Sequence, residues 1–171
     1  MLSEGPSEPI RAGAGLRLRG EDAEDLAVIS ACLQDALVAV RDLAYDPAAR
    51  TFILVANRFR WEAGGSAKED APFERTLCGV AFDAVVDVAY RGFHRSEEDR
   101  ILSLLAIHPV AIPDTVAGGA ATGDAGAVID LEFAAGATIR LSAAAIRCRA
   151  QDFGDPWPTS WQPDHPLDPL P

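Results

Sequence analysis

The stretch "LVAVRDLAYDPAARTFILVANRFRW", residues 37–61, decides the fold class of this chain. Both of its arms are rich in apolar and β-branched residues, and the pattern changes from a helical period of about 3.6 to the period of 2 that is typical of a strand. Between the arms, "DPAAR" at residues 46–50 combines Asp and Pro, a composition that favours a turn. The stretch therefore predicts a β-hairpin.

The segment before the hairpin, "EDAEDLAVISACLQDAL" at residues 21–37, has helical spacing instead. Acids at positions 21, 22, 24 and 25 crowd its beginning, where they complement the helix dipole. We expect one amphipathic helix from about residue 22 to residue 35. Its apolar face consists of Leu26, Ile29, Leu33, Ala36 and Leu37.

Later segments predict further strands. "ERTLCGVAF" and "AVVDVAYRGF" form two strands or one long strand bent at Asp83, and "HRSEEDR" is a charged turn. The remaining strand segments are "ILSLLAIHP", "AVIDLEF", "TIRLS" and "AAIRCRAQDF". The predicted fold is mostly β (α+β): about eight antiparallel strands in a sandwich or partly open barrel, with one N-terminal amphipathic helix covering an edge or mouth.

Residues 42–61 and 130–149 share a faint internal repeat. Each places Asp-Leu before an aromatic residue, then a turn, a strand led by Thr and a late arginine. Two pseudo-symmetric meanders would explain the pattern, and so would the general similarity of amphipathic hairpins.

Composition sets the domain limits and the expected location. We predict a disordered tail over residues 1–14, one β-rich domain over 15–161 with a mobile loop at 109–126, and a Pro-rich tail over 162–171. No secretory signal or membrane-spanning apolar run is evident, so a cytoplasmic protein without membrane contact is expected. The net charge of -11 disfavours nucleic acid as a partner.

The pentapeptide "NRFRW" (Asn57, Arg58, Phe59, Arg60 and Trp61) is the main candidate binding surface. Strand alternation puts its aromatic residues on one face, predicted to extend the core, and its arginines on the other. The arginines have three interpretations: internal pairing, such as Arg60 with Asp35, an anchor for a ligand or protein, or nucleic-acid contact. Trp157 joins the surface, because Pro156 and Pro158 stiffen the chain around it. It either fills a groove of its own domain or inserts into a neighbouring chain.

No catalytic residue, metal site or cofactor is predicted. The three histidines (His94, His108 and His165) lack metal-ligand spacing, and the glycine-rich segment 118–126 lacks the residues of a phosphate-binding loop. The cysteines at 32, 78 and 148 are far apart among apolar residues, which predicts reduced, buried side chains.

Four segments in order resemble a family of small bacterial proteins known only as a domain of unknown function. They are "LQDALVAVRDLAY", "NRFRWE", "HRSEEDRILSLLAI" and "DFGDPWPT", and the resemblance extends over roughly residues 15 to 166. It implies a cytosolic bacterial protein and assigns no activity, ligand or site residue.

From these observations we predict a non-enzymatic protein-interaction domain, with a homodimer or another protein as its partner. The alternative is a small-molecule or enzymatic pocket in which Arg58 or Arg60 holds an anionic group. A third hypothesis is single-stranded nucleic-acid binding.

Overall fold

A computed structural model describes residues 15–62, 73–112 and 126–160. These ranges contain one α-helix, α1 (Ala23–Cys32), and short 3-10 helices that include η1 (Val40–Asp42) and η4 (Ala134–Gly136). The ten strands are β1 (Arg17–Gly20), β2 (Leu37–Ala39), β3 (Leu43–Asp46), β4 (Thr51–Phe59), β5 (Phe73–Phe82), β6 (Val85–Arg91), β7 (Ile101–Val110), β8 (Ala127–Phe133), β9 (Thr138–Ala143) and β10 (Cys148–Thr159). The predicted class, mostly β with one N-terminal helix, is confirmed.

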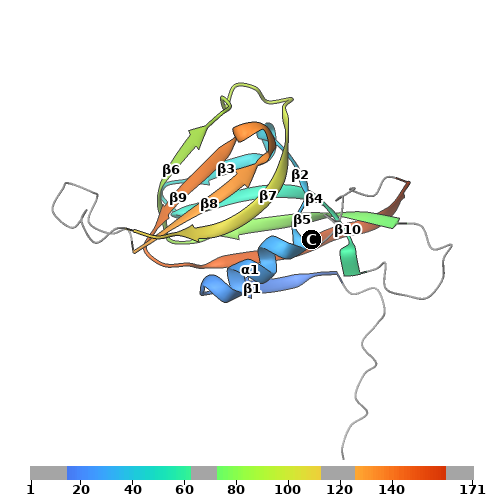
Figure 1. Ribbon diagram of the computed structural model, residues 1–171, viewed down its shortest axis with the longest axis horizontal. Helices are drawn as coiled ribbons and strands as arrows, with labels where there is room; N and C mark the ends of the chain where they lie inside the picture. Colours follow the sequence, from blue (N-terminus) through green and yellow to red (C-terminus); the bar gives the residue numbers. More distant parts are fainter. Residues whose placement is uncertain (1–14, 63–72, 113–125, 161–171) are drawn as a thin grey trace, which may run out of the picture.

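The strands form one antiparallel sheet in the order β1-β10-β5-β4-β2-β7-β8-β9-β6, with β3 paired to β4. The sheet is not closed into a barrel, because β1 and β6 are the two ends of its path. Figure 1 shows β7, β8 and β9 lying in front of β4 and β5. Phe52 and Leu54 of β4 belong to the same core cluster as Leu131 and Leu141 of β8 and β9. The sheet therefore curls around a single core.

Helix α1 begins where the acids predicted and ends earlier than predicted. Asp22 caps it, since its side chain accepts the N–H of Asp25 at 2.9 Å. Asp35 has a φ of +61°, a left-handed conformation that turns the chain from the helix towards β2. Of the predicted apolar face, Leu26, Ile29, Leu33 and Ala36 are buried in the core. The helix packs chiefly on β7 and β1 (Figure 1).

The predicted hairpin is confirmed as β3–β4, in a register that runs from Leu43 opposite Leu54 to Asp46 opposite Thr51. The Asp46 carboxylate accepts the N–H groups of Ala48 and Ala49 at 2.9 and 3.1 Å and fixes the turn. The first predicted arm is interrupted by η1, which separates β3 from β2. Because of this break, β2 pairs with both β4 and β7 and joins the two halves of the sheet.

The corner at Asp83 separates two strands, β5 and β6, and the next residue, Ala84, has a φ of +59°. The two segments of the predicted repeat contain the hairpins β3–β4 and β8–β9, and their symmetry stays a prediction. Strand β7 continues to Val110, two positions into the predicted loop at 109–126. The rest of that loop over 113–125, and the predicted tails 1–14 and 162–171, lie outside the described residues. No helix in the described ranges has the length and apolar character needed to cross a membrane.

Candidate functional site

The buried face of β4 is opposite to the one predicted. Phe52, Leu54 and Ala56 have no exposed surface, whereas Ile53 is 44% exposed. Since side chains alternate along a strand, Arg58 follows these residues on the core face. The expectation that the aromatic residues of "NRFRW" lie on the inward face was wrong, although Phe59 is itself buried. Both faces of β4 carry apolar side chains, so alternation groups the residues correctly without showing which group points inward.

Arg58 is fully buried and binds two carboxylates. Its Nε and Nη2 atoms donate to Oδ1 and Oδ2 of Asp152 at 2.7 and 2.6 Å. Its Nη1 and Nη2 atoms donate to Oε2 and Oε1 of Glu62 at 3.1 and 2.6 Å, and Nη1 also donates to the Phe59 carbonyl at 3.4 Å. A guanidinium has five N–H donors, and these contacts engage all of them. Arg58 is therefore placed to hold the fold together and has no donor left for an external ligand.

The Arg58–Asp152 pair connects strands that are not neighbours in the sheet. Arg58 lies on β4 and Asp152 on β10, and β5 runs between them. Asp152 also accepts the N–H of Leu16 at 2.8 Å. Burial raises the pKa of Asp152, but the hydrogen bonds from Arg58 and Leu16 outweigh burial and hold this pKa below its ordinary value. Burial likewise lowers the pKa of Arg58, yet its hydrogen bonds to both carboxylates raise it overall.

The remaining polar residues of "NRFRW" also bind groups of the sheet. Arg60 forms an ion pair with Glu74 of β5, and its N–H donates to the Glu74 carbonyl at 2.9 Å. The ion pair is thus with the neighbouring strand and not with the predicted Asp35. The side-chain and main-chain oxygens of Asn57 accept from Nη1 of Arg75 at 3.2 and 3.1 Å. Internal pairing is the interpretation that fits both arginines of the pentapeptide.

The aromatic residues gather on the outer face of the sheet. Phe59 is 2% exposed, because its ring packs against Trp61 and Phe73 with centroids 4.6 and 5.6 Å away. The Trp61 indole N–H donates to the Gln34 carbonyl at 3.4 Å. Phe59 is thus buried on a face that elsewhere reaches solvent, and the cause is its aromatic neighbours.

Trp157 lies on β10, which continues past a register shift between Phe153 and Trp157. It is opposite Arg75 of β5 and is 36% exposed. The segment "DFGDPWPT" is therefore a strand of the sheet and does not fill an interior groove. The nearby Phe153 and Phe73 are 45% and 38% exposed. We call Phe73, Phe153 and Trp157 the aromatic face; it belongs to the outer side of β5 and β10.

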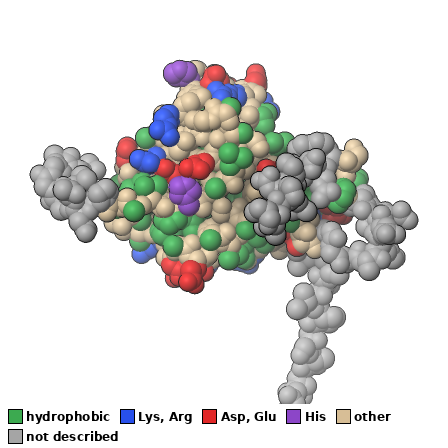
Figure 2. Space-filling model, in the orientation of Figure 1, with side chains coloured by type: hydrophobic (Ala, Val, Ile, Leu, Met, Phe, Trp, Pro, Cys, Tyr) green, Lys and Arg blue, Asp and Glu red, His purple; other side chains and the backbone are tan. Residues whose placement is uncertain are grey.

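A separate charged row crosses β7, β8 and β9. His108 lies opposite Asp130, which lies opposite Arg140. Arg140 holds Asp130 through two hydrogen bonds of 2.7 Å, and His108 Nε2 is 3.0 Å from Oε1 of Glu132. Figure 2 shows acidic and basic side chains around a histidine on this face. The hydrogen bond to Glu132 is the main cause that raises the pKa of His108.

This histidine makes stability depend on pH. A raised folded-state pKa stabilises the fold fully below the unfolded value of about 6.5, and this stabilisation is lost as pH rises through the raised value. We expect Glu132→Gln to lower Tm below pH 6.5 by about 4 °C at most, because exposed pairs contribute about 0–1 kcal/mol. At pH 8 the variant and the wild type should unfold together in a thermal scan. Glu98→Gln in the turn before β7 is the control, and a Glu132→Gln difference that does not change with pH would contradict the prediction.

Two of the three cysteines confirm the expected buried thiols. Cys78 and Cys148 are 0% and 2% exposed, and burial raises the pKa of each to about 12. Cys32, at the end of α1, is only partly buried, and burial raises its pKa as well. Burial thus favours the neutral form of all three thiols, which is opposite to the shift that activates a cysteine nucleophile.

The sequence prediction missed a group of arginines on β1 and at the start of β10. These are Arg17, Arg19, Arg147 and Arg149. The segments that carry them, "LRLRG" at 16–20 and "IRCRA" at 146–150, alternate arginine with apolar residues as "NRFRW" does. The alternation of arginine with apolar or aromatic residues therefore occurs three times in the sequence. The two segments other than "NRFRW" pair with each other in the sheet.

Comparison with known proteins gives a family without an assigned activity. No curated protein and no solved structure matches the chain. The family described as "Protein of unknown function (DUF2948)" matches residues 16–165, close to the limits expected from the resemblance. The match covers most of the 171 residues and includes every described strand and helix. The chain therefore belongs to the DUF2948 family of proteins of unknown function.

Proposed function

We propose that this chain is a non-enzymatic, cytoplasmic protein-interaction domain and that the aromatic face is its contact surface. The observation that carries the proposal is the exposure of Phe73, Phe153 and Trp157 on neighbouring strands. Large apolar side chains that remain accessible together on a folded domain are typical of binding surfaces, and Trp is prominent among the residues that dominate binding energy.

The backbone beneath these side chains supports the same role. Phe73 lies opposite Thr159, and Trp157 lies opposite Arg75, so both rings are carried by paired strands. Pro156 and Pro158 restrict the backbone on either side of the indole. A partner would therefore meet side chains on an ordered scaffold, and binding would lose little conformational entropy.

The structure gives less support to the two other hypotheses, an anion-binding pocket at Arg58 or Arg60 and the binding of single-stranded nucleic acid. A pocket that holds an anion through Arg58 or Arg60 would need their donors, which already bind Asp152, Glu62 and Glu74. Nucleic acid would have to approach a chain with a net charge of -11. The partner to test first is a second copy of the chain.

The test replaces apolar rings of the aromatic face. The double variant Phe153→Ser/Trp157→Ala should shift the mass measured by light scattering from a dimer towards the 18.1 kDa of one chain. Truncating a hot-spot residue, a role in which Trp is enriched, costs at least about 2 kcal/mol of binding energy, so dissociation should become at least about thirtyfold easier if Trp157 is such a residue.

The control is Ile101→Ser, which removes an even more exposed apolar side chain, 54% exposed, from β7. It should leave the mass unchanged, and thermal unfolding should show all variants to be folded. A monomeric wild type at every concentration, or a dimer that both changes leave intact, would contradict a homodimer formed through the aromatic face.

A further inference from the structure

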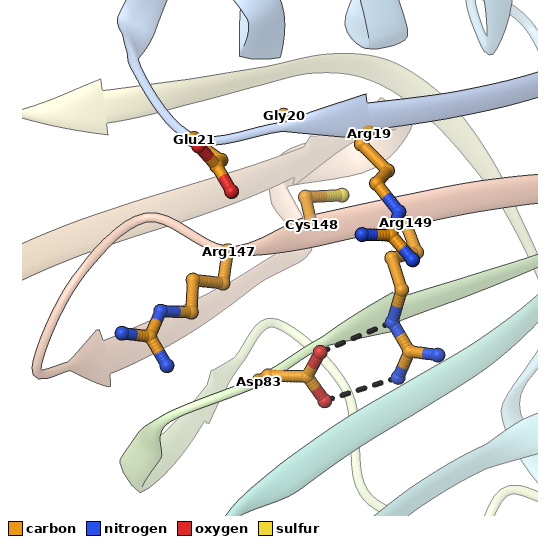
Figure 3. A pocket seen from close by; sticks show the side chains of 7 residues that line it. All are labelled: Arg19, Gly20, Glu21, Asp83, Arg147, Cys148 and Arg149. Atoms are coloured by element: carbon orange, nitrogen blue, oxygen red, sulfur yellow. Dashed lines mark hydrogen bonds and ion pairs between the residues drawn. The ribbon is translucent and has the colours of Figure 1, made fainter.

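A cleft of about 260 Å³ lies where β1, the start of β10 and the β5–β6 corner meet. Arg19, Arg147 and Arg149 line it together with two acids, Glu21 and Asp83. Figure 3 shows the Arg19 and Arg149 side chains next to each other, with Arg147 and Glu21 across the cleft from them. All three arginines are exposed in a chain whose overall charge is strongly negative.

The positively charged arginines of the cleft lie close together although like charges repel each other. Arg19 and Arg149 are direct partners in the antiparallel β1–β10 ladder, and like charges at such positions destabilise a sheet. Arg149 is balanced by Asp83, which its Nε and Nη2 atoms contact at 3.1 Å each. The guanidinium groups of Arg19 and Arg147 form no ion pair or hydrogen bond with another residue that the structure describes. Their charge is available to a ligand.

The acid that orients Arg149 is itself fixed. The Thr51 hydroxyl donates to Asp83 Oδ1 at 3.2 Å, and the Asp83 N–H donates to the Arg147 carbonyl at 2.9 Å. Asp83 therefore fixes the orientation of Arg149 by holding its Nε and one Nη2 donor (Figure 3), and the Nη1 donors and the second Nη2 donor of Arg149 remain for a ligand. A preorganised guanidinium edge is suited to bidentate binding of an oxyanion.

A second groove of about 220 Å³ adjoins the cleft and shares Arg19 and Arg149 with it. Arg17 lies along this groove, and Gly79 and Ala81 of β5 contribute small residues to it. The cleft and the groove together are lined by four arginines and two carboxylates, so their net charge is +2. A phosphate monoester carries about -1.5 to -2 at pH 7 and would neutralise them, whereas a single carboxylate would not.

We propose that this cleft binds a small organic phosphate. Its phosphate group lies among Arg19, Arg147 and Arg149, and its organic part lies in the groove over Gly79 and Ala81. The site shares no residue with the aromatic face, although Gly79 borders it, since a Cβ at Gly79 would lie 3.8 Å from the Phe153 ring. The proposal does not depend on the function proposed above.

Calorimetric titration of the full chain with inorganic phosphate and with phenyl phosphate tests the proposal. We expect both to bind at low salt, and phenyl phosphate to bind more tightly because its ring contacts the groove. Arg19→Gln/Arg147→Gln should weaken both by about tenfold to a hundredfold, as expected when charged hydrogen bonds are lost. Arg41→Gln removes one positive charge at an exposed arginine paired with Asp99, and it should have no effect; each single variant, Arg19→Gln and Arg147→Gln, makes the same change of charge and should weaken binding.

Gly79→Val tests the position of the organic part. A Cβ at Gly79 would lie 3.8 Å from its nearest neighbour, an ordinary contact, and Val favours a strand, so the variant should fold, which a thermal scan checks. It should weaken phenyl phosphate and leave inorganic phosphate unchanged. Absence of phosphate binding, or equal losses in the Arg41→Gln control, would overturn the proposal. So would succinate binding as tightly as phenyl phosphate, or a single-stranded oligonucleotide displacing phenyl phosphate with a steep salt dependence.

Discussion

Replacing Arg58 by Met should destabilise the fold by about 3–5 kcal/mol, the usual cost of removing one partner from a buried ion pair. The change leaves the Asp152 carboxylate, 6% exposed, without the guanidinium that neutralises it. For a domain of this size the loss corresponds to a fall in Tm on the order of 10 °C, measurable by calorimetry or circular dichroism. Arg41→Met is the control, since its pair with Asp99 is exposed and should contribute about 0–1 kcal/mol.

The pH dependence identifies the cause of this loss. In the wild type the pKa of Asp152 is lowered, so its pairing stabilises the fold above the unfolded value of about 3.9, and this is lost as pH falls through the lower folded value. Without Arg58, burial should raise the pKa of Asp152, and acid should then relieve the buried charge. The difference between Arg58→Met and the wild type should accordingly shrink from pH 7 to pH 4. In Arg58→Met/Asp152→Leu part of the lost stability should return at pH 7; a double variant less stable than the single one would contradict this explanation.

Gly92→Ala should destabilise the fold by about 2–5 kcal/mol, from the left-handed backbone and from overpacking. Gly92 follows β6 and has a φ of +81°. A Cβ there would lie 2.6 Å from the Gly136 carbonyl oxygen and 2.9 Å from Ala137 Cα, so backbone at the β8–β9 hairpin would have to move. Chemical denaturation with urea gives the measurement.

Gly136→Ala separates the two contributions. Gly136 has a φ of +75° but nothing within 4 Å of the added Cβ, so the backbone conformation alone is penalised. We expect a loss of about 1–2 kcal/mol for this control. Equal losses at Gly92 and Gly136 would show that the close approach between the β6 end and the hairpin contributes nothing.

The sequence was sufficient for elements whose signals are local. The turn at Asp46 and the helix cap at Asp22 each depend on a few neighbouring residues, and both are present. The burial of Arg58 on the core face of β4 depends instead on Asp152, 94 positions further along the chain. No local pattern could show that a carboxylate so distant would neutralise this arginine in the interior.

The arginine cleft has the same kind of origin. Strand β1 was missed because it is only four residues long and lies next to an expected disordered tail, although it alternates arginine with apolar residues. Its pairing with β10 brings Arg19 opposite Arg149. Alternation within either segment does not predict which distant strand the segment will pair with. Each segment shows the alternating arginines in its sequence, but the cleft forms only where the two strands pair.

The position of β10 governs when the domain can be completed during synthesis. This last described strand lies between β1, the first, and β5. While the nascent chain emerges, β1 has no partner and the edge of β5 stays open until residues 148–159 have been made. Contacts between segments so distant in the chain form slowly, and open strand edges expose a chain to aggregation. The pairing of β1 and of the outer edge of β5 is therefore completed only after translation of the last described strand, and a chain truncated before residue 148 would keep the open edge of β5.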